Sequence, residues 1–406
     1  MKKILTFMLC LGAITPLFAQ KALVEQAKKL SGKPDKLEEA RSLIKQAMQN
    51  PETQNDAQTY YIAGKIEMDA FDNGFKNKMI NPNDPSAQGG VMADEIVAAY
   101  NYFLQALPLD SMPNEKGQIK PKFSKDIINK INGHAADFFT AGADYYNEKA
   151  YYPQAYNAFM IYGNLPEGIL AANAKDFNQQ QIATAFFNAG LAASQGGAPE
   201  ESAQAFKKAR LAGYEQPEAT IYEIACWQTI AQQDESRFAE AQANIKTAAQ
   251  AGIDAFGIDN SIFLNNLINS MVSDGEIDQA IAKLNELIAA NPEAANLYGL
   301  RGYVYDRAEK DDLSEADYRK ASSLPSADFE TLKNTSNKLY RVGATKLNDL
   351  EGTSAETKAA REDIKVNYFI EAQNLANRAN EMQPGDPYIQ NILDSIDYAL
   401  TTFFNN

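Results

Sequence analysis

Apolar residues recur at intervals of three and four along almost the whole chain. One representative stretch carries them at Ile277, Ala280, Ile281, Leu284, Leu287 and Ile288. This spacing lines one face of an α-helix. Runs of alternating β-branched residues, which are typical of strands, are absent. Turn-forming pairs such as Asn50-Pro51 and Asn291-Pro292 interrupt the pattern at intervals of about one helix. The pattern predicts an all-α protein.

The helical pattern also repeats itself with a period of 34 residues. In the window Ser261–Ala294, large and small residues occupy set positions at which two helices would pack against each other. When 34 is added to each residue number, most of the residues found there are also suited to packing between helices. The compared positions are Leu264, Leu267, Met271, Gly275, Ala280, Leu284, Leu287 and Pro292 in the first window and Tyr298, Arg301, Tyr305, Glu309, Ser314, Tyr318, Ala321 and Ser326 in the second, where Pro325 lies one place early. Gly302 lies where a small residue lets two helices approach.

This helix–turn–helix unit resembles the tetratricopeptide repeat. The first helix of that repeat carries a large residue, Leu-Gly and Tyr, and the second carries Ala, Phe, Ala and Pro. Further windows match in part, for example at Gly142 with Phe159 and at Gly190 with Phe206. The resemblance implies a right-handed α-solenoid of about eight units over residues 20–406, in which each helix pair buries a face against the next. A capping helix is expected at residues 386–404.

Three segments depart from this register. We expect an insertion at Phe71–Asp94 and an irregular basic segment at Met112–Lys130. Two lengthened helices, at Lys333–Leu350 and Ala355–Met382, would either carry a docking surface or cap the stack. The basic segment contains a patch formed by Lys116, Lys120, Lys122 and Lys125. This patch would receive an anionic partner, such as a lipid headgroup or an acidic protein face, or would simply be solvated.

Polar residues on the first helix of several units predict a concave binding groove. They lie one turn apart on the side away from the neighbouring second helix. The candidates are Tyr61, Lys65, Asp69, Asp144, Asn147, Asn265, Asn269, Tyr303, Asp306, Arg307, Tyr340 and Arg341. Tyr and Arg provide a large contact area and directed hydrogen bonds, and Asn can form hydrogen bonds with the N–H and C=O groups of a peptide backbone. For each residue, ordinary solvation of a polar face is the alternative. Lys333 and Asn337 have the chemistry of a carboxylate clamp, but no full unit follows to complete it, and no clamp is predicted.

The N-terminus predicts export. Lys2 and Lys3 precede the apolar run Ile4–Ile14, and Ala19 offers a small residue at a cleavage site, so Met1–Ala19 resembles a signal peptide. No later stretch is long and apolar enough to span a membrane. The expected location is therefore the periplasm or the exterior. Removal of this segment would leave Cys226 as the only cysteine, which we expect to be a small buried core residue.

Composition narrows the chemistry. The chain has 53 acidic against 38 basic residues and a net charge of −15, which argues against a nucleic-acid partner. Its single histidine, His134, is expected to be exposed at a helix start and excludes His-rich metal sites. Phosphate-binding Gly loops, Cys-x-x-Cys pairs and Gly-x-Ser-x-Gly strings are absent. We therefore predict no cofactor, no metal and no catalytic residue.

Three functions remain. The first is a non-enzymatic scaffold of the cell envelope that binds another envelope protein or a peptide in the groove. The second is a glycan- or nutrient-binding envelope module, by analogy with starch-binding outer-membrane proteins that carry similar helices, although one Trp offers few sugar-stacking platforms. The third is an all-α glycosidase or lyase, which would need two carboxylates at a fixed separation.

Overall fold

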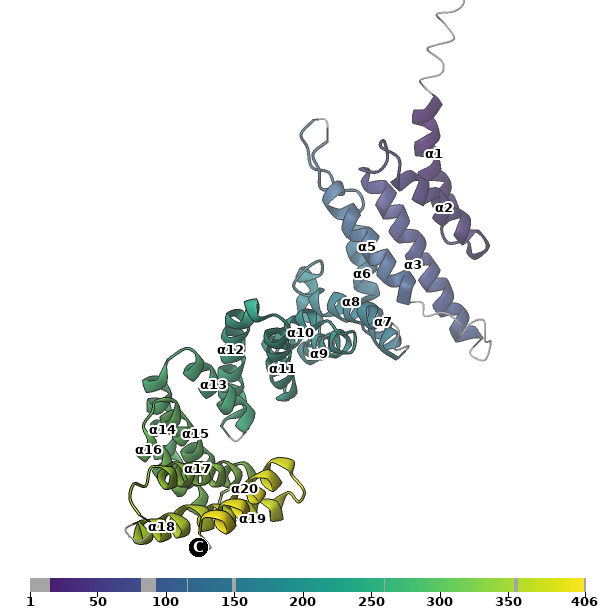
Figure 1. Cartoon of the computed structure of the whole chain (residues 1–406). Coiled ribbons are helices and arrows are strands. Elements are labelled where there is room, and N and C mark those ends of the chain that lie inside the picture. The colour runs from purple at the N-terminus through teal and green to yellow at the C-terminus, as the bar shows by residue number, and fades with distance from the viewer. Residues whose placement is uncertain are drawn as a thin grey trace, which may run out of the picture. The chain divides into compact units, whose positions relative to one another are not determined.

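The computed structural model describes residues 15–81, 93–114, 116–147, 151–258, 260–353 and 357–404, with side chains from residue 21 onward. Within these ranges the regular secondary structure is helical and contains no strand. The chain divides into two compact units, Met1–Asn244 and Ile245–Asn406 (Figure 1). No helix in the described ranges has the length and apolar character needed to cross a membrane.

Unit 1 is built from consecutive helices that pair with their neighbours in sequence. These helices are α1 (Thr15–Leu30), α2 (Leu37–Met48), α3 (Ala57–Ile80), α5 (Ala93–Asp110), α6 (Ser124–Gly133), α7 (Ala135–Asn147), α8 (Tyr152–Asn164), α9 (Gln179–Gln195), α10 (Pro199–Leu211) and α11 (Glu218–Gln233). The main pairs are α1 with α2, α3 with α5, α7 with α8 and α9 with α10. Helix α12 (Phe238–Phe256) contains the boundary between the two units.

Unit 2 continues the same arrangement of helix pairs. Its helices are α13 (Ser261–Ser273), α14 (Ile277–Ala290), α15 (Ala295–Arg307), α16 (Asp311–Ser323), α17 (Phe329–Asn348), α18 (Lys358–Ile364), the π-helical η4 (Lys365–Ile370), α19 (Glu371–Met382) and α20 (Pro387–Phe403). α18, η4 and α19 follow one another without a break. α15 packs on α14 and α16, α17 packs on α19, and α20 packs on α19.

Side-chain caps and prolines determine where several helices begin. The Asp56 carboxylate accepts a hydrogen bond from the Gln58 amide at 2.9 Å at the start of α3, and Asp328 accepts one from the Thr331 amide at 2.8 Å at the start of α17. Such caps satisfy amides that have no partner within the helix. Pro199 is the first residue of α10, where its missing N–H costs no hydrogen bond.

A glycine of the first helix faces an aromatic ring of the second helix in several hairpins. A Cβ at Gly190 of α9 would lie 2.6 Å from the Phe206 ring of α10, and one at Gly142 of α7 would lie 2.6 Å from the Phe159 ring of α8. Neither site has room for a larger residue. The ring fills the space that the missing side chain leaves, so the two helices approach closely. Because this contact recurs, successive hairpins bury their apolar faces in a similar way.

The segments expected to be irregular are shorter than the sequence suggested. α3 continues to Ile80 and α5 begins at Ala93, while residues 82–92 of the expected insertion Phe71–Asp94 lie outside the described residues. The helix continues past Asn73-Gly74 because Phe71 is buried and its ring meets the His134 ring edge-on at 5.6 Å. Tertiary packing therefore overrides the local turn preference.

The basic segment Met112–Lys130 is also partly helical, since α6 begins at Ser124 and, of the described residues, 112–114 and 116–123 are irregular. Of the expected signal peptide Met1–Ala19, residues 1–14 lie outside the described residues, and residues 15–19 belong to α1.

Candidate functional site

The first helices of three successive hairpins in unit 2 line a continuous polar groove. Side chains of α13, α15 and α17, joined by some from α16, enclose two cavities of about 610 and 300 Å³. Tyr303, Tyr318 and Asn334 line both cavities, so the two are joined. We call this surface the unit 2 groove.

One half of the unit 2 groove is rich in side-chain amides. Asn265 and Asn269 of α13, Asn296 of α15 and Asn334 of α17 line the smaller cavity. Each amide has both a donor and an acceptor group. A row of such groups can form hydrogen bonds with the N–H and C=O groups of an extended peptide, whatever the peptide's side chains are.

The other half of the groove carries charges of both signs, and one ion pair there is structural. Lys338 of α17 is buried, and its Nζ lies 2.5 Å from Asp306 Oδ1 of α15. The same oxygen accepts a hydrogen bond from Ser314 Oγ of α16 at 2.7 Å. These contacts hold three helices together. In contrast, Arg307 and Arg341 are exposed, and no salt bridge within the described residues involves either of them.

A buried phenol lies at the junction of the two halves. Tyr318 is only 8% exposed, although it lines both cavities. Burial raises the pKa of Tyr318, the charge of Asp306 and the neighbouring Tyr303 raise it further, and Arg341 opposes the shift. The phenol therefore keeps its proton near neutral pH and can act as a hydrogen-bond donor.

The structure brings half of the predicted groove residues together in the unit 2 groove. They are Asn265, Asn269, Tyr303, Asp306, Arg307 and Arg341. Tyr340 lies elsewhere, because its ring meets the buried Phe369 ring edge-on at 5.8 Å, inside the core between α17 and η4. Adjacent residues of a helix differ by about 100° in direction. Tyr340 is turned towards the core of unit 2, while Arg341, the next residue of α17, lines the groove.

The three predicted residues of α3 are held by contacts within unit 1. The Tyr61 ring stacks on Phe123 at 4.5 Å, and its hydroxyl donates a hydrogen bond to Asp126 Oδ2 at 2.8 Å. Lys65 Nζ lies 2.6 Å from Asp69 Oδ2 and donates to Ser31 Oγ at 3.1 Å. The sequence did not reveal these contacts because the partners belong to other helices and loops.

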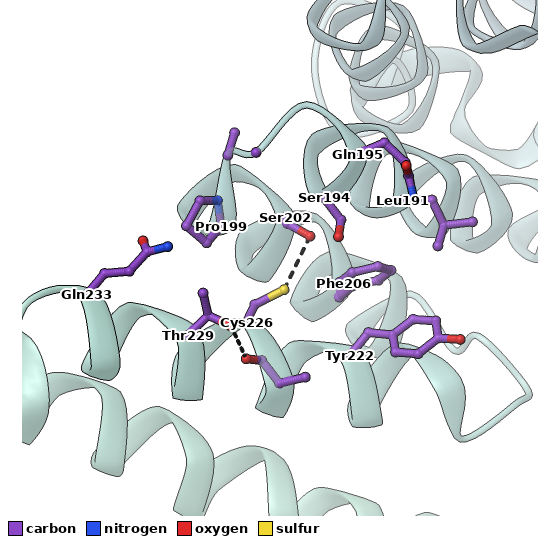
Figure 2. A pocket seen from close by; sticks show the side chains of 13 residues that line it. Leu191, Ser194, Gln195, Pro199, Ser202, Phe206, Tyr222, Cys226, Thr229 and Gln233 are labelled. Atoms are coloured by element: carbon purple, nitrogen blue, oxygen red, sulfur yellow. Dashed lines mark hydrogen bonds between the residues drawn. The ribbon is translucent and has the colours of Figure 1, made fainter. Parts of the chain in front are cut away.

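A second groove lies in unit 1. Asn147, one of the predicted residues, lines a cavity of about 150 Å³ with Phe159 and Leu191, whereas the predicted Asp144 of the same helix is exposed and does not line this cavity. Leu191 also lines a neighbouring cavity of about 410 Å³ between α9, α10 and α11 (Figure 2). Among the described residues, no charged side chain lines either of these two cavities. We call this surface the unit 1 groove.

Cys226 lies on the wall of the unit 1 groove and is half-buried, whereas the sequence predicted a buried core residue. Its Sγ is 3.3 Å from Ser202 Oγ (Figure 2). Burial raises the pKa of the Cys226 thiol, the Ser202 hydrogen bond opposes this shift, and Glu223 adds to it. The thiol is therefore protonated at neutral pH, and a protonated thiol is a poor nucleophile.

His134 directly precedes α7, so its predicted place at a helix start is confirmed, whereas its predicted exposure is wrong. It follows the end of α6 and is half-buried, with Nδ1 2.9 Å from Asp137 Oδ2 and Nε2 3.4 Å from Asp72 Oδ1. These partners come from α7 and α3, so packing of three helices covers a side chain that local sequence placed in solvent. Within the described residues no group of three or more His, Cys, Asp or Glu side chains could hold a metal ion.

The predicted basic patch is exposed. Lys116, Lys120 and Lys122 lie in the loop between α5 and α6, and Lys125 lies in the first turn of α6. None of the four lysines has a salt bridge to another described residue. The patch contributes to neither groove.

No model of a known protein family matches the chain, and no curated protein matches it either. Several solved structures resemble it. MamA (41-end) from Desulfovibrio magneticus RS-1 is 15% identical, with a TM-score of 0.31 over 48% of this chain and 96% of MamA. Yeast Tom70 is 13% identical, with a TM-score of 0.32 over 95% of this chain and 89% of Tom70. The TPR2AB domain of yeast Sti1, solved as a complex with pHSP90, is 13% identical, with a TM-score of 0.23 over 82% of this chain and 99% of that domain.

Similarities this low carry no argument about activity or partner. The fold itself is established by the helix pairs, by the recurring glycine–aromatic contact and by the alignment of α13, α15 and α17 along one groove. The chain is therefore an all-α protein built from tetratricopeptide-like helical hairpins.

Proposed function

We propose that this protein is a non-enzymatic interaction scaffold that binds an extended segment of a partner protein in the unit 2 groove. The observation that carries the proposal is the convergence of side chains from three successive first helices on one continuous groove. A linear peptide can contact all three helices at once, whereas a small molecule would fill only one part of this surface.

The chemistry of the groove supports a protein ligand. Its asparagines match the repeated N–H and C=O groups of a peptide backbone. Arg307, Arg341 and Tyr303 offer side chains of the types that contribute most to binding energy at protein interfaces. The unpaired arginines favour a partner segment with an acidic residue near this end of the groove.

Two carboxylates of the groove, Asp306 and Glu315, are held in ion pairs. Asp306 is held by Lys338 and Ser314, and Glu315 lies 2.9 Å from Arg319 Nε. Hydrolysis of a glycosidic bond needs two carboxyl groups free to act on opposite sides of the bond. A carboxylate that is held in an ion pair is poorly suited to that task.

The proposed setting is the cell envelope, either the periplasm or the exterior. This part of the proposal rests on the sequence of Met1–Ala19, with its basic start, apolar run and small residue at the end. The partner would then be another exported protein or a peptide derived from one.

Photo-crosslinking in intact cells tests the groove. A photoreactive p-benzoylphenylalanine in place of Tyr303 should crosslink to one or a few partner proteins. The double variant Arg307→Glu/Arg341→Glu should reduce crosslinking to the partner by at least about tenfold, because arginine is among the few residue types that carry most of the binding energy at interfaces. Arg378→Glu/Lys358→Glu is the matched control, because it makes the same change in net charge and both residues are exposed and line neither cavity of the groove.

Equal crosslinking in the double variant and in the control would contradict binding in this groove. A rise of the melting temperature with oligosaccharides and not with peptides would favour the glycan-binding alternative instead.

A further inference from the structure

The loop between α5 and α6 carries positive charge on an acidic protein. Figure 1 shows this loop extending past the end of α5. Lys116, Lys120 and Lys122 of the loop and Lys125 of α6 are all exposed, and none has a salt bridge to another described residue. We call the described residues 111–114 and 116–125 the lysine loop. Lys130, further along α6, is excluded because it lies 4.0 Å from Asp126.

The base of the lysine loop is fixed by a buried carboxylate. Asp110 accepts hydrogen bonds from the amides of Lys122, Phe123 and Ser124 at 2.8–2.9 Å and from Ser124 Oγ at 2.6 Å. Burial alone would raise the pKa of Asp110, but these hydrogen bonds outweigh it and lower the pKa. The carboxylate is therefore turned inward, and its charge is compensated by donors rather than by the lysines.

The tip of the lysine loop also has a defined turn. Asn114 Oδ1 accepts hydrogen bonds from the amides of Lys116 at 2.9 Å and Gln118 at 3.1 Å, and Gly117 has a φ of 69°. A positive φ at this position favours glycine. An ordered loop loses less conformational entropy on binding than a flexible one. Binding through these lysines therefore carries a small entropic penalty.

Two large apolar side chains accompany these charges. Met112 is 59% exposed and Ile119 is 60% exposed, and they lie before and after the turn. Exposed apolar residues beside lysines are the combination by which peripheral proteins enter the interfacial layer of a membrane.

The charge pattern favours lipid over an acidic protein. The cations are lysines with no arginine among them, and lysine is depleted from protein interfaces, where arginine is enriched. A point charge on a flexible stem suits loosely arranged lipid phosphates, whereas arginine suits the fixed geometry of a carboxylate. The chain as a whole carries −15, so other parts of the surface are repelled from an anionic membrane.

We propose that the lysine loop docks the protein on an anionic phospholipid surface, with Met112 and Ile119 inserted among the headgroups. This interaction is independent of the unit 2 groove, whose residues it does not use. The residues of the lysine loop line neither groove.

Vesicle co-sedimentation of the full chain tests this proposal. Vesicles of phosphatidylethanolamine with phosphatidylglycerol should bind the protein, and vesicles of phosphatidylcholine alone should not. Binding should weaken steeply as salt rises from about 0.05 to 0.5 M, because exposed charges are screened. Replacement of Lys116, Lys120, Lys122 and Lys125 by Ser should reduce binding by roughly fivefold per lysine.

The matched control replaces Lys29, Lys45, Lys310 and Lys358 by Ser. These lysines are also exposed and have no salt bridge within the described residues, so the control removes the same net charge. Insertion is measured with Ile119→Trp in a Trp227→Phe background, whose tryptophan emission should shift to the blue on anionic vesicles only. The Met112→Ser/Ile119→Ser variant should bind more weakly without losing its salt dependence. An unchanged melting temperature shows that each variant is folded.

Equal vesicle binding by the loop variant and the control, or no binding of the wild-type chain, would overturn the proposal. Loop lysines that are needed to capture an acidic protein but not to bind vesicles would also overturn it, in favour of a protein partner.

Discussion

At the scale of single residues, glycines decide how closely the hairpins pack. A Cβ at Gly343 of α17 would lie 2.7 Å from the Cβ of Tyr368 in η4, and a Cβ atom cannot rotate away. Gly299 of α15 has no such neighbour within 4 Å. Both residues lie inside helices of unit 2, so they form a matched pair that separates helix preference from packing.

Gly343→Ala should lower the free energy of unfolding by about 1–3 kcal/mol, because the added methyl group forces the two helices apart. Gly299→Ala should raise it by about 0.5–1 kcal/mol, because alanine restricts the unfolded chain and suits a helix interior. Urea denaturation measures both. Two changes of the same sign would show that Gly343 is not a packing contact.

Tyr61 provides a prediction about pH at the same scale. Burial raises the pKa of Tyr61 to about 12, with further contributions from its hydrogen bond to Asp126 and from the charges of Asp126 and Asp69. The folded state therefore holds this proton more tightly than the unfolded chain, where the pKa is about 10. Its contribution to stability is complete below pH 10 and is lost as pH rises towards 12.

The difference between the ultraviolet titrations of the wild-type chain and Tyr61→Phe at the phenolate band should show one tyrosine with a pKa of about 12. In Asp126→Asn the pKa of Tyr61 should fall, because the charge that opposes ionisation is gone. A Tyr61 that titrates near pH 10 in the wild-type chain would show that the phenol is not held by this contact.

At the scale of helices, buried ion pairs join neighbours in unit 1. Arg210 of α10 binds the Glu223 carboxylate of α11 through Nε at 2.8 Å and through a second nitrogen at 3.1 Å, and Glu223 is only 1% exposed. Removal of one partner would leave an uncompensated buried charge. The exposed pair of Lys28 and Glu25, at 3.9 Å, provides a contrast within the same unit.

Arg210→Ala should therefore destabilise unit 1 by about 3 kcal/mol or more. Lys28→Ala should change its stability by no more than about 0.5 kcal/mol. Thermal and urea unfolding of both variants measures the difference. Similar effects of the two substitutions would mean that the pair of Arg210 and Glu223 is solvated in solution.

At the scale of the whole molecule, two units each have a core of their own. One core in unit 1 includes Phe103, Phe138 and Phe159, and one in unit 2 includes Leu332 and Phe369. In repeat architectures each hairpin gains stability mainly from its immediate neighbours. A local defect should therefore loosen nearby helices and leave distant ones protected.

Hydrogen exchange tests this expectation. Gly190→Ala should speed hydrogen exchange in α9 and α10 of unit 1 and leave exchange in α15–α17 unchanged. Gly343→Ala should speed exchange in α15–α17 and leave exchange in α9 and α10 unchanged. A loss of protection that spreads through both units in either variant would show that the chain unfolds as one cooperative body.

Local sequence predicted the helices and their register. The three- and four-residue apolar spacing reports directly on which face of a helix is buried. The size pattern at Gly302 and Tyr318 places a small residue against a large one, as the structure finds. The same phase assigned Asn265, Tyr303 and Arg341 to one groove, because residues on equivalent faces of successive first helices align in a stack.

The tertiary structure decided which polar residues on those faces are free. Lys65 and Asp69 are bound by each other and by Ser31, and Asp306 is bound by Lys338, 32 residues further along the chain. A helical period shows the direction of a side chain on its own helix. It carries no information on what another helix or loop places opposite that side chain, and those long-range partners separate a structural ion pair from a binding residue.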